Sequence, residues 1–150
     1  MPRFTRVLIV VLLALAPAKA FADPTEDASA VIDRWAATYN ANDADAITKL
    51  YTPDALLHGT SSPTLNQGSA EIRKYFGVLP GSGSKVTIGE RHMVALGDTA
   101  AFGAGFYEFV SMQNGSPISR PARFTMIIVK RGADWLIVHH HSSALPPPRQ

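Results

Sequence analysis

Apolar residues in the first half of the chain recur at the spacing of helices. After Asp23-Pro24-Thr25-Glu26, which is typical of a helix start, they return every three or four residues. The predicted inward residues of this helix are Ala28, Val31, Ile32, Trp35 and Tyr39. A shorter helix is predicted from Asp43 to Pro53, with Ala44, Ile47, Leu50 and Tyr51 inward. A third is predicted over 69–79, with Ile72, Tyr75, Phe76 and Leu79 on one face.

The second half of the chain has the composition of strands, with turn residues between them. Four strands are predicted at 85–96, 99–113, 119–131 and 135–145, joined by hairpin turns, and a short one at 55–58. Three N-terminal helices packed on a curved antiparallel sheet give an α+β fold with a pocket between the layers. Gly103 and Gly105 fall inside a strand, where sharp curvature or a bulge is expected.

The first 22 residues have the pattern of a secretory signal peptide. Arg3 and Arg6 precede a ten-residue apolar run, and small residues follow up to Ala20 and Ala22, the two candidate cleavage sites. The run is too short to span a bilayer, which needs roughly 20 residues. We therefore expect a periplasmic or secreted protein with a single domain at 23–146, an extended tail at 147–150 and no membrane association after cleavage.

Removing this segment changes the charge of the chain. It contains Arg3, Arg6 and Lys19 and no acid, so 11 of the 14 basic residues remain beside 12 acidic ones. The net charge falls from +2 to −1 and no basic run is left, which argues against nucleic acid as a partner. The chain has no cysteine, so thiolate nucleophiles and thiolate metal sites are excluded.

The last predicted strand carries the densest candidate chemistry, in the stretch WLIVHHHSSALP (135–146). Side chains of a regular strand alternate between two faces. One face is then expected to hold Leu136, Val138, His140 and Ser142. The other face is expected to hold Trp135, Ile137, His139, His141 and Ser143.

This order of elements, with WLIVHHHSS on the last strand, resembles the nuclear transport factor 2-like cone fold. Within that fold the chain resembles the association-domain family of calcium/calmodulin-dependent protein kinase II, over roughly 25–146. The stretches GTSSPT (59–64), IRKYF (72–76) and HHHSS (139–143) resemble bacterial and algal iota-class carbonic anhydrases. Pocket arginines of the kinase hub correspond here to Tyr107, Met126 and Ser142, which argues against a pocket for an organic carboxylate.

The resemblance implies reversible hydration of carbon dioxide to bicarbonate in the cone pocket. It places His140 and Ser142 on the inward face, where a neutral imidazole titrating near neutrality and a hydroxyl could activate water. It adds Tyr75 and Thr60 as catalytic candidates. The implied binding residues are Tyr107, Phe106, Phe124, Met126 and Ser143. Each of these residues could instead serve only packing or turn stability.

Metal dependence stays open, because family members are described both as metal-free and as metal-using. We expect no cofactor, since His139 and His141 point away from the face of Ser142. If zinc or manganese is used, His139 and His141 are the expected ligands, with His58, His92 or else an Asp or Glu as a third. A non-catalytic ligand-binding or oligomerisation module is the alternative function, and an isomerase or dehydratase with an Asp–His pair is a third. A homodimer or larger homo-oligomer is expected.

Overall fold

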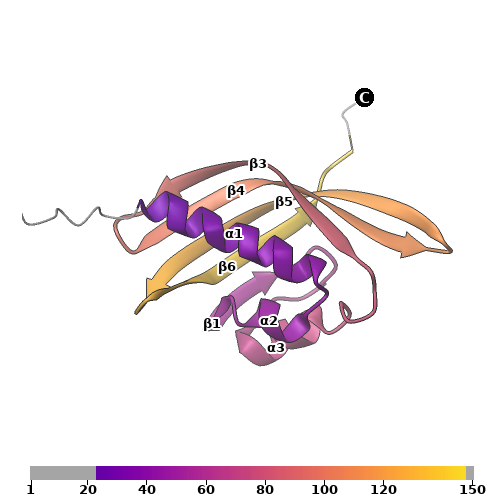
Figure 1. Cartoon of the computed structure of the whole chain (residues 1–150), viewed down its shortest axis with the longest axis horizontal. Helices are drawn as coiled ribbons and strands as arrows, with labels where there is room; N and C mark the ends of the chain where they lie inside the picture. Colours follow the sequence, from indigo (N-terminus) through magenta and orange to yellow (C-terminus); the bar gives the residue numbers. More distant parts are fainter. Residues whose placement is uncertain (1–22, 148–150) are drawn as a thin grey trace, which may run out of the picture.

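The computed structural model describes residues 23–147, so the predicted signal peptide and residues 148–150 of the predicted tail lie outside the described residues. The elements are α1 (Pro24–Asn40), α2 (Ala44–Thr48), β1 (Tyr51–His58), β2 (Asn66–Gln67), α3 (Gly68–Phe76), β3 (Lys85–Ala95), β4 (Ala100–Gln113), β5 (Ser116–Arg131) and β6 (Asp134–Ala144). Figure 1 shows α1 lying along one face of the sheet, and the hairpin of β4 and β5 projecting beyond the helices.

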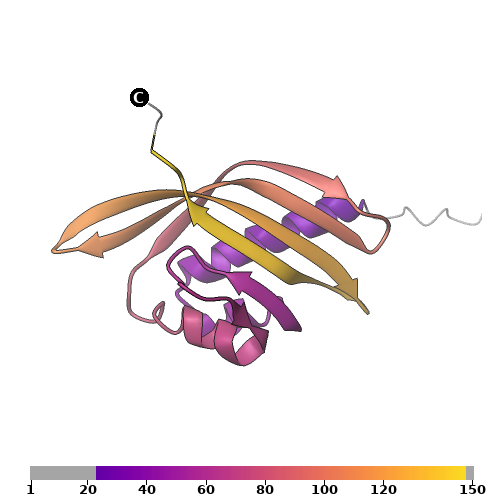
Figure 2. The ribbon, with the colours of Figure 1, turned by 180° about the vertical axis from the view of Figure 1, so that it is seen from behind.

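The sheet has the strand order β2-β1-β6-β5-β4-β3. The four long strands were expected and form the antiparallel meander, but β1 pairs with β6 in parallel, so the sheet is mixed rather than antiparallel throughout. The short strand predicted at 55–58 is part of β1, and because β1 and β2 lie between α2 and α3, three N-terminal helices in succession are not confirmed. In the view from behind, no described helix covers the outer face of the sheet (Figure 2).

Helix α1 covers the concave face of the sheet as its sequence pattern predicts. The Asp23 carboxylate caps it by accepting a 2.9 Å hydrogen bond from the backbone N–H of Thr25, and Pro24 occupies the first turn. The buried residues of α1 are Ala28, Val31, Ile32, Trp35 and Ala36. Among residues 23–147, no helix is both long and apolar enough to cross a membrane.

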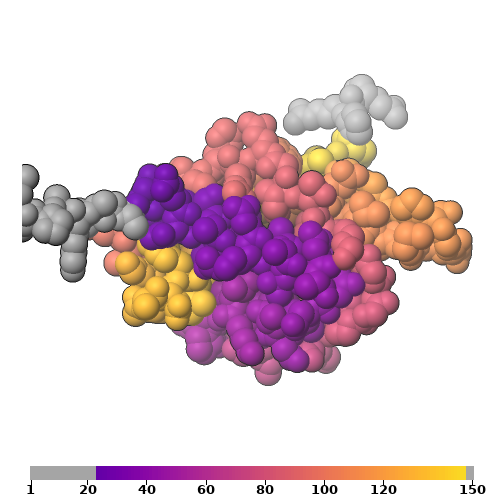
Figure 3. Space-filling view, in the orientation of Figure 1, coloured from indigo at the N-terminus to yellow at the C-terminus, as the bar shows by residue number. Residues whose placement is uncertain are grey.

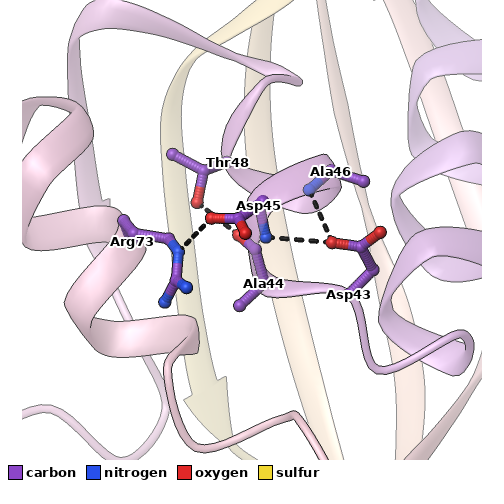
Figure 4. A network of polar contacts seen from close by, with 6 residues as sticks. All are labelled: Asp43, Ala44, Asp45, Ala46, Thr48 and Arg73. Atoms are coloured by element: carbon purple, nitrogen blue, oxygen red, sulfur yellow. Dashed lines mark hydrogen bonds and ion pairs between the residues drawn. The ribbon is translucent and has the colours of Figure 1, made fainter.

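Helix α2 is shorter than the sequence predicts. Its cap, Asp43, accepts hydrogen bonds from the backbone of Asp45 and Ala46, and Asp45 pairs with Arg73 of α3 (Figure 4). The helix ends at Thr48, and Tyr51 begins β1 instead of extending the helix. A proline disfavours helical backbone in the residue before it, so Pro53 favours this early switch to strand.

The expected curvature at the mid-strand glycines is present. A Cβ atom at Gly103 would lie 2.8 Å from Cδ1 of Ile32 and 2.6 Å from Sδ of Met93, so the missing side chain lets α1 approach β4. The register of β3 against β4 shifts between Ile88 and Arg91, beside Gly105. Space-filling atoms show the helical layer packed closely over the sheet, with the β4–β5 tip extending past it (Figure 3).

Strand β6 contains an irregularity that the simple alternation did not predict. Its register against β5 shifts between the pair Ile127–His139 and the pair Ile128–Ile137, which leaves Val138 as an extra residue. Trp135 and Ile137 are therefore buried on the same concave side as His140 and Ser142. The expected grouping of Leu136 and Val138 with His140 is wrong, while the separation of His140 and Ser142 from His139 and His141 holds.

Candidate functional site

A cavity of about 470 Å³ lies between the helical layer and the concave face of the sheet. It is lined by Trp35, Tyr39, Leu57, Gly59, Thr60, Ser61, Tyr75, Phe76, Val78, Leu79, Ser84, Tyr107, Phe109, Val110, Ser111, Arg120, His140 and Ser142. The lining is mostly aromatic and aliphatic, with hydroxyl groups contributed by α1, α3, β4, β6 and the loops after β1 and before β3. Among the described residues, no aspartate or glutamate lines it.

The deepest polar contacts join Trp35, Tyr51 and His140. The indole N–H of Trp35 donates to the Tyr51 hydroxyl at 2.9 Å, and that hydroxyl lies 2.8 Å from Nδ1 of His140. Because an indole can only donate, the buried Tyr51 hydroxyl is left to donate its own proton to Nδ1. The neutral imidazole therefore carries its hydrogen on Nε2.

The same chain continues outward from the other ring nitrogen. Nε2 of His140 lies 3.4 Å from the Tyr107 hydroxyl, which donates to Oγ of Ser142. Ser142 in turn contacts Oγ1 of Thr60, on the loop that follows β1. A continuous row of polar groups thus runs from buried Trp35 to Thr60, which is exposed.

Burial sets the charge of this chain. Burial, with smaller contributions from nearby His139 and His141, lowers the pKa of His140 to about 3. Burial also raises the pKa of the Tyr107 and Tyr51 hydroxyls. All three groups are therefore neutral at neutral pH, and the expectation that His140 titrates near neutrality is corrected. The imidazole acts here as an oriented donor and acceptor.

The structure brings all four predicted catalytic residues to the cavity wall. His140, Ser142 and Thr60 belong to the hydrogen-bonded chain, and Tyr107 joins them from β4. Tyr75 lies on the same wall, with its hydroxyl 3.5 Å from Oγ of Ser61. Its ring occupies the space that a side chain at position 59 would need, which explains the glycine there.

The remaining predicted binding residues lie elsewhere. Phe106 points outward and is 48% exposed, because it alternates with inward Tyr107. Ser143 is on the outer side as well, where it accepts a 3.0 Å hydrogen bond from Nε of Arg123. Phe124 and Met126 are buried in the core beneath the cavity, and Phe124 stacks on Tyr107 at 5.0 Å between ring centroids.

The other histidines form a separate group on the outer side of the sheet. The ring of His58 lies 6.2 Å from that of His139 and 5.7 Å from that of His141. His92 instead contacts Glu90 at 3.1 Å. Within residues 23–147, no three His, Asp or Glu side chains are arranged to hold a metal ion. The cavity does not fit zinc or manganese either, since its one imidazole has Nδ1 bonded to Tyr51 and its lining has no carboxylate.

Sequence reasoning missed Trp35 and Arg120 as cavity residues, and Tyr51 as the buried partner of His140. Tyr51 was expected on a helix, and Trp35 was expected only as core. Arg120 lies near the start of the predicted third strand, where an isolated arginine carries no recognisable pattern. Strand pairing could have found it, since Arg120 pairs with Phe109 and must share its face.

Comparisons with known proteins agree with this architecture. The family model described as SnoaL-like domain matches residues 28–147. A structure from Xanthomonas campestris, described as a calcium/calmodulin dependent protein kinase II association domain, is 31% identical with a TM-score of 0.77, covering 95% of this chain and 100% of that one. A search of curated proteins gave no match.

More distant structures share the fold alone. An NTF2-like protein with a cystatin-like fold from Novosphingobium aromaticivorans has a TM-score of 0.72 at 17% identity, covering 83% of this chain and 84% of that one. A ketosteroid isomerase-like protein from Erwinia carotovora atroseptica has a TM-score of 0.71 at 18% identity, with 85% and 100% covered. The α+β cone fold is confirmed, and these matches do not bear on carbonic anhydrase activity.

Proposed function

The chain belongs to the SnoaL-like domain family, and within it we propose that this cavity catalyses the reversible hydration of carbon dioxide to bicarbonate. The observation that carries the proposal is the row of hydroxyl groups of Tyr107, Ser142 and Thr60, which opens into a cavity without a carboxylate among its described lining. Carbon dioxide is uncharged, so apolar walls and hydroxyl donors are sufficient to hold it.

In the proposed reaction, the oxygen of a water molecule forms a bond to the carbon of carbon dioxide. One C=O π bond of carbon dioxide breaks, and negative charge develops on the carbon dioxide oxygen of that bond. One hydroxyl of the Ser142–Thr60 pair donates to the other, and the remaining free O–H of the pair donates to this charge in the proposed reaction, as a donor of an oxyanion hole does. The proton lost by the water passes to solvent at the exposed Thr60 end, and bicarbonate leaves by the same opening.

His140 has a positioning role in this scheme. Its low pKa, about 3, makes it a poor proton acceptor at neutral pH. Its Nε2–H instead faces the Tyr107 oxygen and leaves the Tyr107 proton directed at Ser142. The imidazole therefore fixes which way the hydroxyl row points.

Isomerase or dehydratase chemistry with an acidic base has less support. Ketosteroid isomerase uses an aspartate as general base. Here Glu108 alternates away from Tyr107, is exposed and contacts Ser119, and no other acid of the described residues reaches the cavity wall. The cavity lacks the group that such a reaction needs.

One observation favours the alternative of a small-ligand-binding module. About 470 Å³ is far more than one carbon dioxide molecule fills, and it lies in the range of pockets for organic ligands. Binding without turnover is therefore the second candidate function.

The pH drop after mixing carbon dioxide-saturated water with weak buffer separates the two candidates. The protein from Asp23 to Gln150 is expected to accelerate this drop, and to do so equally after exhaustive chelation. If chelation abolishes the activity and added zinc or manganese restores it, the metal-free part of the proposal is overturned. No acceleration with or without added metal would leave only the binding module.

A further inference from the structure

Arg120 is the one lysine or arginine among the described residues that line the cavity. It lies on β5 directly opposite Phe109 of β4, and directly paired strand residues share a face. Its side chain is therefore on the concave side, where β4 and β5 extend past the helical layer (Figure 1). This exposed part of the cavity lining, called the cavity mouth below, is distinct from the exposed end at Thr60.

No carboxylate of residues 23–147 pairs with this guanidinium. The ion pairs among residues 23–147 are Arg73–Asp45, Arg91–Asp33 and His92–Glu90, and none involves Arg120. Its Nη1 donates to Oγ of Ser111 at 2.6 Å, which orients the group and occupies one of its five N–H donors. The remaining donors are available to a ligand.

The apolar side chains beside Arg120 favour one class of ligand. Phe109 and Tyr39 pack against each other at 5.3 Å between ring centroids, and both line the cavity together with Leu79 and Val110. A guanidinium beside aromatic and aliphatic side chains suits a ligand that has a carboxylate at one end and an apolar part at the other.

This position is separate from the hydroxyl row. Ser142 pairs with Phe124 of β5, four residues along the strand from Arg120, which is about 13 Å at the usual rise of a strand. An anion on Arg120 would therefore not touch Ser142.

We propose that Arg120 and Ser111 form an anion subsite at the cavity mouth that binds a carboxylate group. The anion is either bicarbonate or an organic acid whose apolar part lies along Phe109 and Leu79. The kinase-hub arginine positions, held here by Tyr107, Met126 and Ser142, are not involved. The subsite does not depend on the proposed hydration reaction.

Equilibrium binding tests the subsite without turnover. Benzoate and its neutral analogue benzamide are titrated into the protein by calorimetry at constant ionic strength, since exposed charges are screened by salt. Benzoate is expected to bind about tenfold more tightly than benzamide, as a charged hydrogen-bonded pair contributes. Arg120→Gln is expected to abolish this preference. Its thermal midpoint should stay at that of wild type, because Arg120 is exposed.

Arg123→Gln is the matched control. Arg123 is on the same strand but on the outer side, where it binds Ser143, so its loss should leave the benzoate preference intact. Equal binding of benzoate and benzamide, or an equal effect of both substitutions, would overturn the proposal. Bicarbonate is titrated in parallel: Arg120-dependent binding of bicarbonate identifies it as an occupant, and binding of benzoate alone identifies an organic acid.

Discussion

Ser142 is the residue on which the hydroxyl row converges, since it accepts from Tyr107 and contacts Thr60. Ser142→Ala is expected to lower the rate of carbon dioxide hydration by about 10²–10³, the usual effect of removing one oxyanion donor. The thermal midpoint should fall modestly, because the buried Tyr107 hydroxyl loses its acceptor while little packing is lost. Stopped-flow pH measurements give the rate.

Ser143→Ala is the control for that substitution. The two serines are adjacent in the chain, but Ser143 lies on the outer side of the sheet and binds Arg123. Full activity is expected for Ser143→Ala. Equal losses in the two variants would contradict the assignment of Ser142 to the reaction.

His140 is expected to make stability depend on pH. Its pKa is about 3 when folded, against about 6.5 in an unfolded chain. Between about pH 6.5 and 3, His140 therefore binds a proton in the unfolded chain but stays neutral in the folded chain. Stability from this group is complete above about pH 6.5 and is lost as the pH falls towards 3, at about 1.4 kcal/mol per pH unit.

The measurement is the urea midpoint between pH 7.5 and 4.5 for wild type and His140→Gln. The variant is expected to be less stable at pH 7.5 and to have a flatter profile, because it cannot titrate. His92→Gln, at an exposed histidine, controls for general effects of losing an imidazole. Parallel profiles for wild type and His140→Gln would contradict a depressed pKa.

At the scale of elements, α1 approaches β4 closely at Gly103. Gly103→Ala would place a Cβ atom 2.8 Å from Cδ1 of Ile32. The expected cost is about 1–3 kcal/mol of stability, as for other overpacked cores. Thermal or urea unfolding measures it. Ala104→Ser adds one atom at the neighbouring position on the outer side and should lower stability far less. Similar losses of stability in the two variants would show that the contact between Gly103 and Ile32 does not determine the cost.

The elements also show how far the sequence could predict the site. Periodicity predicted α1 and the four long strands because each buries a single face. It failed at Val138, since a bulge adds one residue without any special residue type, and at Tyr51, whose hydroxyl partners are 16 and 89 positions away. His140 and Ser142 still fell on one face because the bulge precedes both.

At the scale of the whole molecule, the described fold begins at the predicted cleavage site. Asp23 caps α1, so cleavage after Ala22 would leave the cap intact. Expressed in a Gram-negative host, the protein is expected in the periplasmic fraction with its N-terminus near Asp23. N-terminal mass spectrometry of that fraction checks this, and an exported chain that retains Met1 would contradict it. Self-association stays a prediction, which light scattering after gel filtration can test.

The indole of Trp35 has a consequence for the electric field in the cavity. A row of hydroxyl groups can normally point in either of two directions, and reversing them all reverses its dipole. Here the innermost group, the indole N–H of Trp35, cannot accept a hydrogen bond, so reversing the row would leave the buried Tyr51 O–H without an acceptor. The O–H bonds of Tyr51 and Tyr107 are therefore both directed outward along the row, towards Ser142. Negative charge that appears there meets dipoles already aligned and needs no reorientation of the protein.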